Sequence, residues 1–128
     1  MDFAAGVTKI MPVQFSASWL LASTFYTCIA LPLDEIVWVY EQVYVTRGRS
    51  CSVCLRDRQG GFAEFTCALF QVKKIIDYIT RVRPWVVSGY SGQAAVDFAT
   101  DRARFVTEVD RRRQQYLAAS APMPPYPP

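Results

Sequence analysis

The segment IMPVQFSASWLLASTFYTCIALPL, which runs from Ile10 to Leu33, carries no charged side chain over its 24 residues. A helix needs roughly 20 apolar residues to cross the hydrocarbon core of a bilayer. The length therefore predicts one transmembrane helix over residues 10–33. Its serines and threonines favour packing against other membrane helices, because small and hydroxylated residues allow close helix contact. The residues expected in that packing are Ala17, Ser18, Trp19, Leu21, Ala22, Phe25 and, beyond the segment, Trp38.

Two other interpretations of the same segment stay open. It is compatible with a buried core helix of a soluble domain, with Pro12 and Pro32 as its limits. It is also compatible with a signal peptide, since Cys28-Ile29-Ala30 resembles a small-residue cleavage site. The flank before it, residues 1–9, holds Lys9 as its only basic side chain and is not an arginine-rich transit peptide.

The composition limits the classes of function. The chain has 128 residues, enough for one small domain, and 52% of them are hydrophobic, which fits burial in a membrane or against partners. The net charge is +3, and the acids and bases alternate after residue 33, so we expect no nucleic acid partner. The absence of histidine excludes Ser-His and Cys-His catalysis and histidine-ligated metals within this chain. We therefore expect a protein without catalytic residues and without a cofactor.

Residues 34–61 are predicted to form a strand or a helix, followed by a cysteine-containing loop. The stretch Ile36–Thr46 is rich in β-branched and aromatic residues, which favours a strand paired with Cys51–Leu55 in a short hairpin. A helix is the alternative if residues 10–33 span a membrane, because four apolar residues also fall at helical spacing. These four residues are Ile36, Val39, Tyr40 and Val43.

Cysteines supply the one local motif with metal or redox chemistry. Cys51 and Cys54 form a C-x-x-C pair, and Cys67 follows as a third candidate zinc ligand. Zinc takes four ligands, and no histidine is present to complete the set. A disulfide is the second alternative. We expect ordinary thiols and no bound metal.

Two helices are predicted in the second half of the chain. An amphipathic helix over residues 62–83 presents apolar residues at three- and four-residue steps and ends before Pro84. A connector over 84–92 leads to a charged helical arm over 93–119, which Ser91 caps. The proline-rich segment 120–128 is predicted to form polyproline II and to dock on a neighbouring subunit. The arm is expected to bind a partner through Phe98, Phe105, Val109, Arg112 and Tyr116.

These elements together predict a mostly α-helical protein with one transmembrane helix, a short β-hairpin, an amphipathic helix and a C-terminal helical arm. The alternative is a small soluble α+β domain. The first interpretation predicts a non-catalytic accessory subunit of a multi-subunit membrane complex, in the mitochondrial inner membrane, with other subunits and membrane lipid as partners. The second predicts a viral or regulatory module for protein–protein interaction.

Overall fold

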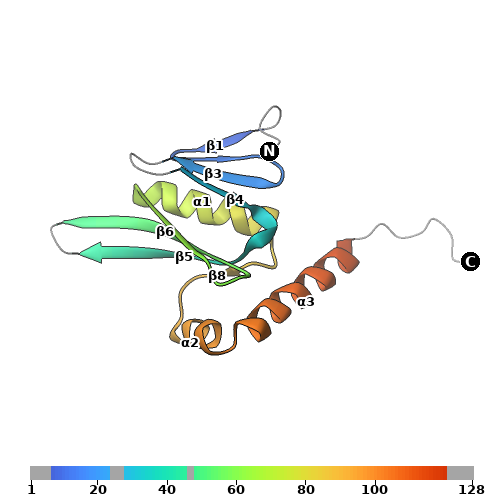
Figure 1. Cartoon of the computed structure of the whole chain (residues 1–128). Coiled ribbons are helices and arrows are strands. Elements are labelled where there is room, and N and C mark those ends of the chain that lie inside the picture. The colour runs from blue at the N-terminus through green and yellow to red at the C-terminus, as the bar shows by residue number, and fades with distance from the viewer. Residues whose placement is uncertain (1–6, 24–27, 46–47, 121–128) are drawn as a thin grey trace, which may run out of the picture.

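The computed structural model describes residues 7–23, 28–45 and 48–120, and these residues form an α+β fold (Figure 1). Among these residues, seven strands precede the three α-helices in the chain, and the two-residue strand β8 lies between the first two helices. The elements in chain order are β1 (Thr8–Ile10), β2 (Val13–Phe15), β3 (Trp19–Ser23), β4 (Cys28–Pro32), the 3-10 helix η1 (Leu33–Glu35), β5 (Ile36–Val45), β6 (Arg49–Asp57), β7 (Phe62–Cys67), α1 (Leu69–Val82), β8 (Val87–Ser88), α2 (Gly92–Thr100) and α3 (Arg102–Ser120).

The segment predicted to be a transmembrane helix folds instead into the antiparallel sheet β1-β2-β3-β4. Val13, Phe15, Leu20 and Ala22 alternate along β2 and β3 with less buried neighbours, and all four are fully buried. This two-residue period belongs to strands, and the turn after β2 is closed by Ser16 Oγ, which accepts from the Trp19 N–H at 3.0 Å.

The membrane prediction fails together with that helix. Over residues 7–23, 28–45 and 48–120, no helix combines the length and the apolar character that crossing a membrane requires. The mostly α-helical fold and the single-pass location in the mitochondrial inner membrane both depended on it. Both predictions are contradicted, and the α+β alternative is confirmed as the fold class.

The second sheet has the strand order β7-β6-β5-β8. The predicted hairpin is present, because β5 pairs antiparallel with β6 from Trp38 opposite Arg56 to Val45 opposite Arg49. The helical alternative is therefore wrong for Ile36–Val45, the part of the predicted stretch that the structure describes. The predicted helix 62–83 is also too long at its start, since β7 takes its first six residues and α1 begins at Leu69.

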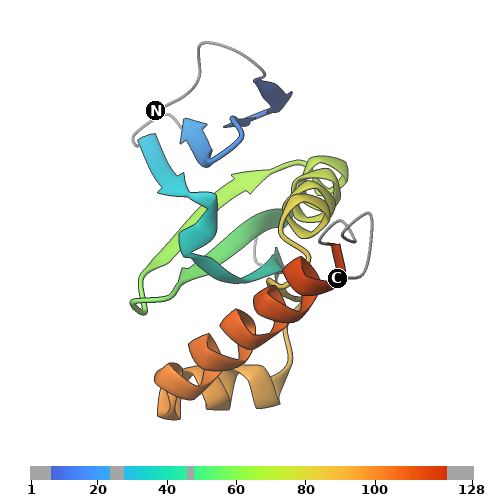
Figure 2. The ribbon, with the colours of Figure 1, turned by 90° about the vertical axis from the view of Figure 1, so that its right-hand side faces the viewer.

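Helix α1 lies between the two sheets (Figures 1 and 2). Its buried residues Val72, Ile75 and Ile79 belong to the common core, and its Tyr78 ring lies 4.3 Å from the Phe15 ring of β2, centroid to centroid. Helices α2 and α3 lie beside the opposite face of the second sheet (Figure 1). The second sheet is therefore covered by helices on both faces along part of its length.

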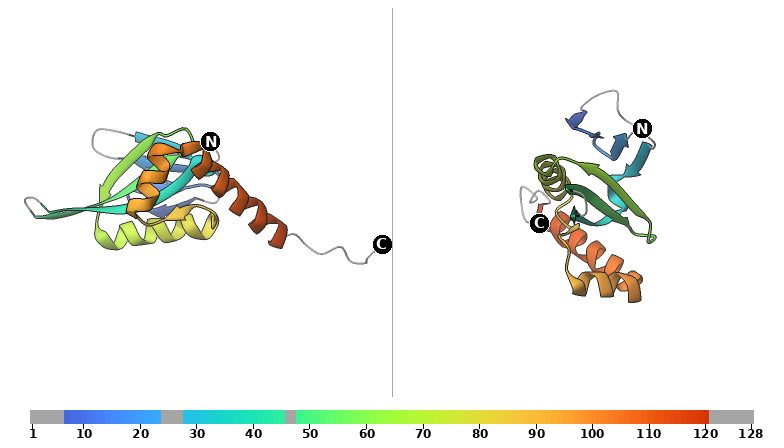
Figure 3. Two further views of the ribbon diagram at one scale, coloured as in Figure 1. Left: turned by 90° about the horizontal axis from the view of Figure 1, so that it is seen from below. Right: turned by 90° about the vertical axis from the view of Figure 1, so that its left-hand side faces the viewer.

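The predicted arm 93–119 is divided into two helices at Asp101. The Asp101 Oδ1 atom accepts a hydrogen bond from the Arg104 backbone N–H at 3.1 Å, as the N-cap residue of a helix does. Helix α2 therefore ends, and α3 begins, at this residue. Ser91 caps α2 as predicted, with Oγ accepting from the Ala94 N–H at 3.0 Å. The C-terminal end of α3 extends away from the rest of the molecule (Figures 1 and 3), beyond the contacts of Arg113 and Tyr116 with Trp85.

Candidate functional site

Strand β5 has an edge that is largely uncovered. Its neighbour on that side, β8, is two residues long and pairs only with Trp38 and Val39. The remaining residues, Tyr40–Val45, have no strand beside them on that side among the residues that the structure describes. We call this stretch the open edge of β5. The hairpin that carries it extends beyond the helices and the first sheet (Figure 3, left).

The direction of the backbone groups on the open edge follows from one hydrogen bond. The Gly89 N–H donates to the Val39 carbonyl oxygen at 2.9 Å, so Val39 turns its backbone groups toward β8. Because the pairing direction alternates along an antiparallel strand, Glu41, Val43 and Val45 turn theirs to the same side. The residues between them turn toward β6, opposite Cys54, Ser52 and Ser50. Glu41, Val43 and Val45 thus present backbone N–H and C=O groups that have no backbone partner among the described residues.

The side chains at the open edge are unusually apolar for an exposed strand. Val43 is 36% exposed, Tyr44 42% and Val45 73%. Natural sheets protect a free edge with charged residues, proline, a bulge or a covering segment. Here Glu41 is the only charged residue in the stretch, and no proline interrupts it. This edge has the properties of a surface that another strand covers.

A polar cluster beside the edge fixes the distal part of the hairpin. Glu64 Oε2 of β7 accepts from the Tyr44 hydroxyl at 2.7 Å and from the Cys54 thiol at 3.3 Å. The hydrogen bond to Glu64 is the main reason that the pKa of Tyr44 is raised to about 12. Burial, followed by the hydrogen bond to Glu64, raises the pKa of Cys54 to about 12. Both groups therefore stay protonated donors at neutral pH and hold three strands together.

The cysteines do not form a metal site in the described part of the chain. Residues three apart in a strand point to opposite faces, so the thiols of Cys51 and Cys54 are separated by the sheet. Cys67 lies opposite Cys51 on the next strand, and all four cysteines are free thiols. No group of three His, Cys, Asp or Glu side chains that could hold a metal ion occurs in the described ranges.

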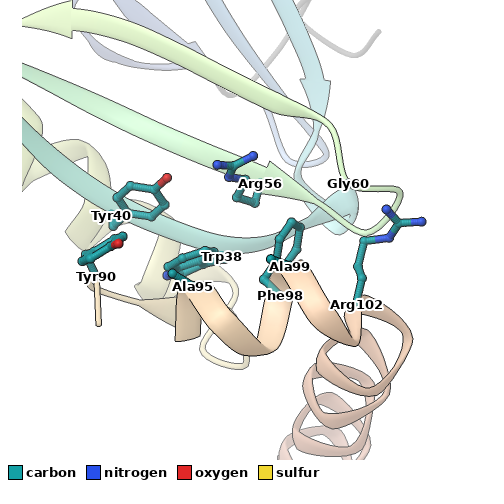
Figure 4. A pocket seen from close by; sticks show the side chains of 9 residues that line it. All are labelled: Trp38, Tyr40, Arg56, Gly60, Tyr90, Ala95, Phe98, Ala99 and Arg102. Atoms are coloured by element: carbon teal, nitrogen blue, oxygen red, sulfur yellow. The ribbon is translucent and has the colours of Figure 1, made fainter. Parts of the chain in front are cut away.

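A hollow of about 330 Å³ lies on the face of the second sheet that α2 covers (Figure 4). Figure 4 shows Trp38, Tyr40 and Tyr90 at one end, with Arg56 and Arg102 on either side of Phe98. We call this the aromatic–arginine hollow, and the residues that define it are Trp38, Tyr40, Tyr90, Phe98, Arg56 and Arg102.

The backbone at Gly60 is adapted to this hollow. Gly60 has a φ of +90°, and a Cβ atom there would lie 2.3 Å from Nη1 of Arg102. Only glycine adopts this φ without strain and leaves room for the guanidinium beside the β6–β7 turn. The position of Arg102 at the rim of the hollow therefore depends on Gly60.

The described residues that were predicted to pack against membrane helices lie in or beside β3, except Trp38, which lies in β5. Ala17 and Ser18 are exposed in the turn before β3, whereas Trp19 and Leu21 are half-buried in β3. Ala22 and Trp38 are buried within this chain's own core, and Phe25 lies outside the described residues. These positions do not form one continuous surface.

The predicted partner-binding residues of the arm fall into two groups. Phe98 and Val109 are buried, and Phe105 is half-buried against Trp38, with 5.9 Å between the ring centroids. Tyr116 is exposed, and its ring lies 5.7 Å from that of Trp85. Arg112 is half-buried on the same helix. The first part of the arm belongs to the core, and the proline-rich stretch 121–128 lies outside the described residues.

No protein-family model, curated protein or solved structure matches the chain. Sequence reasoning missed both the open edge and the hollow, although Trp38 and Phe98 were singled out for other roles. The one signal in the sequence was the ten-residue stretch of β5, which is rich in β-branched and aromatic residues and indicates a long strand.

Proposed function

We propose that this chain is a non-catalytic protein–protein interaction module that binds an extended segment of a partner protein as an added strand on β5. The observation that carries the proposal is the row of outward-facing, unpaired backbone groups at Glu41, Val43 and Val45. Strand addition of this kind gives affinity through main-chain hydrogen bonds and specificity through alternate side chains.

The energetics define what the partner segment must contain. Six backbone hydrogen bonds at 0.5–1.5 kcal/mol each contribute roughly 3–9 kcal/mol. Association costs roughly 4–15 kcal/mol in lost freedom, so the backbone bonds alone give little or no net affinity. Burial of the exposed Val43 and Val45 side chains must supply the difference, at about 25 cal/mol per Å² of apolar surface.

The partner chemistry follows from this requirement. Val43, Val45 and Glu41 point to one face of the sheet, because residues two apart in a strand share a face. A matching segment places β-branched or aromatic residues beside the two valines and a lysine or arginine beside Glu41. We therefore propose a basic, alternating, β-prone segment as the partner, rather than an acidic or proline-rich one.

Selection of binding peptides from a random-sequence library displayed on phage tests this function. The decisive variant is Val43→Pro, which removes the outward N–H but leaves the pairing with β6 intact, because proline is tolerated where the N–H faces away from the sheet. Val43→Thr is the matched control, since threonine keeps the N–H and the β-branched shape. Hydrogen exchange on the free protein should show Glu41, Val43 and Val45 exchanging faster than Gln42 and Tyr44.

The expected result is a set of basic, alternating peptides that bind wild type and V43T and bind V43P at least about tenfold more weakly. Peptides that bind V43P as tightly as wild type would show that the edge is not the site. A chain that is already dimeric, and that V43P makes monomeric, would also overturn the proposal as stated, because a second copy would then be the occupant of the edge.

A further inference from the structure

The aromatic–arginine hollow has the composition of a ligand site that the proposed strand addition does not use. It lies on the covered face of the second sheet, whereas strand addition uses the backbone edge of β5. Its volume of about 330 Å³ is at the lower end of the range for small-molecule sites. A ligand that fits it is therefore about the size of one ring with one substituent.

Two cationic groups at the hollow have no anionic partner among the described residues. Arg56 Nε is buried without a hydrogen-bond partner in those residues. Its guanidinium carbon lies 4.3 Å from the centroid of the Phe62 ring and 5.7 Å from that of Phe98. These contacts hold the group in place and stabilise its charge, but they leave the Nε–H donor unused, which is unfavourable for a buried polar atom.

Arg102 is the second cationic group at the hollow. No hydrogen bond or ion pair of its guanidinium occurs within residues 7–23, 28–45 and 48–120, although Asp101 precedes it in the chain and Asp57 belongs to the same β6–β7 turn as Gly60. Asp57 Oδ1 accepts from the N–H groups of Gln59 and Gly61, and Asp101 Oδ1 accepts from the Arg104 N–H. Each of these carboxylates thus accepts backbone N–H groups through Oδ1 and forms no ion pair with Arg102 among the described residues.

The other end of the hollow presents aromatic rings. Tyr90 is 61% exposed, its ring lies 6.0 Å from that of Trp38 at an interplanar angle of 20°, and it meets the Tyr40 ring edge to face at 5.4 Å. Tyr90 lines the hollow together with Trp38 and Tyr40 and is largely exposed, so a further planar ring can pack at this end, where stacked or offset rings are favourable. Guanidinium groups in turn bind carboxylate and phosphate through charge-assisted hydrogen bonds.

We propose that the aromatic–arginine hollow binds a small planar aromatic anion, with the ring against the aromatic end formed by Trp38, Tyr40 and Tyr90 and the carboxylate or phosphate turned toward Arg56 and Arg102. One anion then satisfies both cations, including the unused Nε–H of Arg56. A neutral ring lacks the charge, and a free inorganic anion lacks the stacking surface, so neither meets both ends of the hollow.

Nuclear magnetic resonance titration of the isotopically labelled full chain tests this site. The probes are phenyl phosphate and benzoate, which carry both a ring and an anion, benzamide, which carries only the ring, and inorganic phosphate, which carries only the anion. The reporters are the Arg56 Nε–H and the Trp38 indole N–H, which donates to the Gly89 carbonyl at 2.9 Å and so marks the aromatic end. Comparing the two ring anions shows whether carboxylate or phosphate is preferred.

The decisive variant is Arg102→Ala, because Arg102 is exposed and its removal leaves the core intact. Arg104→Ala is the matched control on the same turn of α3. At least one ring anion should give saturable shifts at both reporters. R102A should weaken it at least about tenfold, as loss of a charge-assisted hydrogen bond implies, while R104A and V43P should not change it.

Three results would overturn the inference. These are the absence of saturable shifts with both ring anions, equal binding by R102A and wild type, and binding of benzamide or inorganic phosphate as tight as that of the ring anions. Unchanged binding in V43P keeps this test separate from that of the open edge, so either proposal can fail without the other.

Discussion

Replacing Phe98 with alanine tests whether α2 and α3 belong to the core or form an attached arm. Phe98 is 8% exposed. Its ring lies 5.7 Å from that of Trp38 and 5.3 Å from that of Phe105, which it meets at 89°. The residue therefore joins α2, α3 and β5 in one aromatic cluster with Trp38 and Phe105.

The expected cost follows from the buried surface and the ring contacts. Removal of a buried phenylalanine costs roughly 3–5 kcal/mol, including the cavity that remains. The two ring contacts, at about 0.5–1.5 kcal/mol each, place this site in the upper half of that range. We expect a loss of about 4 kcal/mol, which is a large share of the 5–15 kcal/mol typical of a whole domain. The midpoint of thermal unfolding should fall by roughly 15 °C in a chain of this size.

Urea unfolding followed by tryptophan fluorescence and by far-ultraviolet circular dichroism measures this free energy. Leu117→Ala is the matched control, because Leu117 lies on the C-terminal end of α3 and is 46% exposed, so its loss should cost less than about 1 kcal/mol. If F98A and L117A differ by less than about 1 kcal/mol, α2 and α3 do not share the core. The aromatic–arginine hollow would then lack one of its walls.

Three further predictions concern a charged contact, a pH dependence and a turn. Arg58 donates to the Asp34 carbonyl at 3.0 Å and to Asp110 at 3.3 Å, so R58A should cost about 1–2 kcal/mol by urea unfolding, after allowance for its partial exposure, while R81A should cost almost nothing. The pKa of Cys54 is raised to about 12 from an ordinary value of 9.0. The stability that the buried, protonated Cys54 thiol contributes is therefore complete below pH 9.0 and is lost as the pH rises toward 12. Alkylation of Cys54 below pH 9.0 as fast as that of the exposed Cys28 would contradict this prediction. Gly60→Ala should cost about 1–2 kcal/mol through backbone strain and should also weaken ring-anion binding by displacing Arg102, whereas G48A, at a positive φ with open space around it, should show only the strain.

The sequence predicted the second sheet better than the first. The β-branched run of β5 gives a clear strand pattern, and the hairpin with β6 was anticipated on that basis. The segment 10–33 was misinterpreted because its outward-facing positions are also largely apolar, as Trp19, Leu21 and Ala30 show. Because Trp19 and Leu21 stand beside Leu20, the two-residue period of Leu20 and Ala22 is not visible in the sequence, and the absence of charge over the whole segment remains as the stronger signal.

The helix predicted over residues 62–83 was given too early a start for a related reason. Phe62, Phe65, Leu69 and Val72 follow at three- and four-residue steps, but the first two lie in β7 and the last two in α1. The apolar positions of the strand happen to continue the spacing of the helix. The spacing of apolar residues alone does not show that Phe65 pairs with Val53 across two strands rather than lying on a helix.

Neither proposed site could be predicted from the sequence, because each depends on a length or a contact that only the fold determines. The edge is open because β8 covers two residues of a ten-residue strand, and Val87–Ser88 gives no strand signal by itself. The hollow exists because α2, which begins two residues after Tyr90, brings Phe98 to the sheet beside Trp38 and Arg56.

The alternation along β5 explains why one strand can serve both the edge and the hollow. The side chains of Trp38 and Tyr40 point to the face that α2 covers and contribute rings to the hollow. The alternate residues Val39, Glu41, Val43 and Val45 turn their backbone groups toward β8, which covers only the beginning of β5. A shift of the β5–β6 register by one residue would exchange these roles, placing the valines against α2 and turning the backbone groups of Tyr40 and Tyr44 to the open side. The hydrogen bonds from Tyr44 and Cys54 to Glu64 exist only in the observed register, so the same polar cluster that raises both pKa values also fixes which backbone groups remain available to a partner.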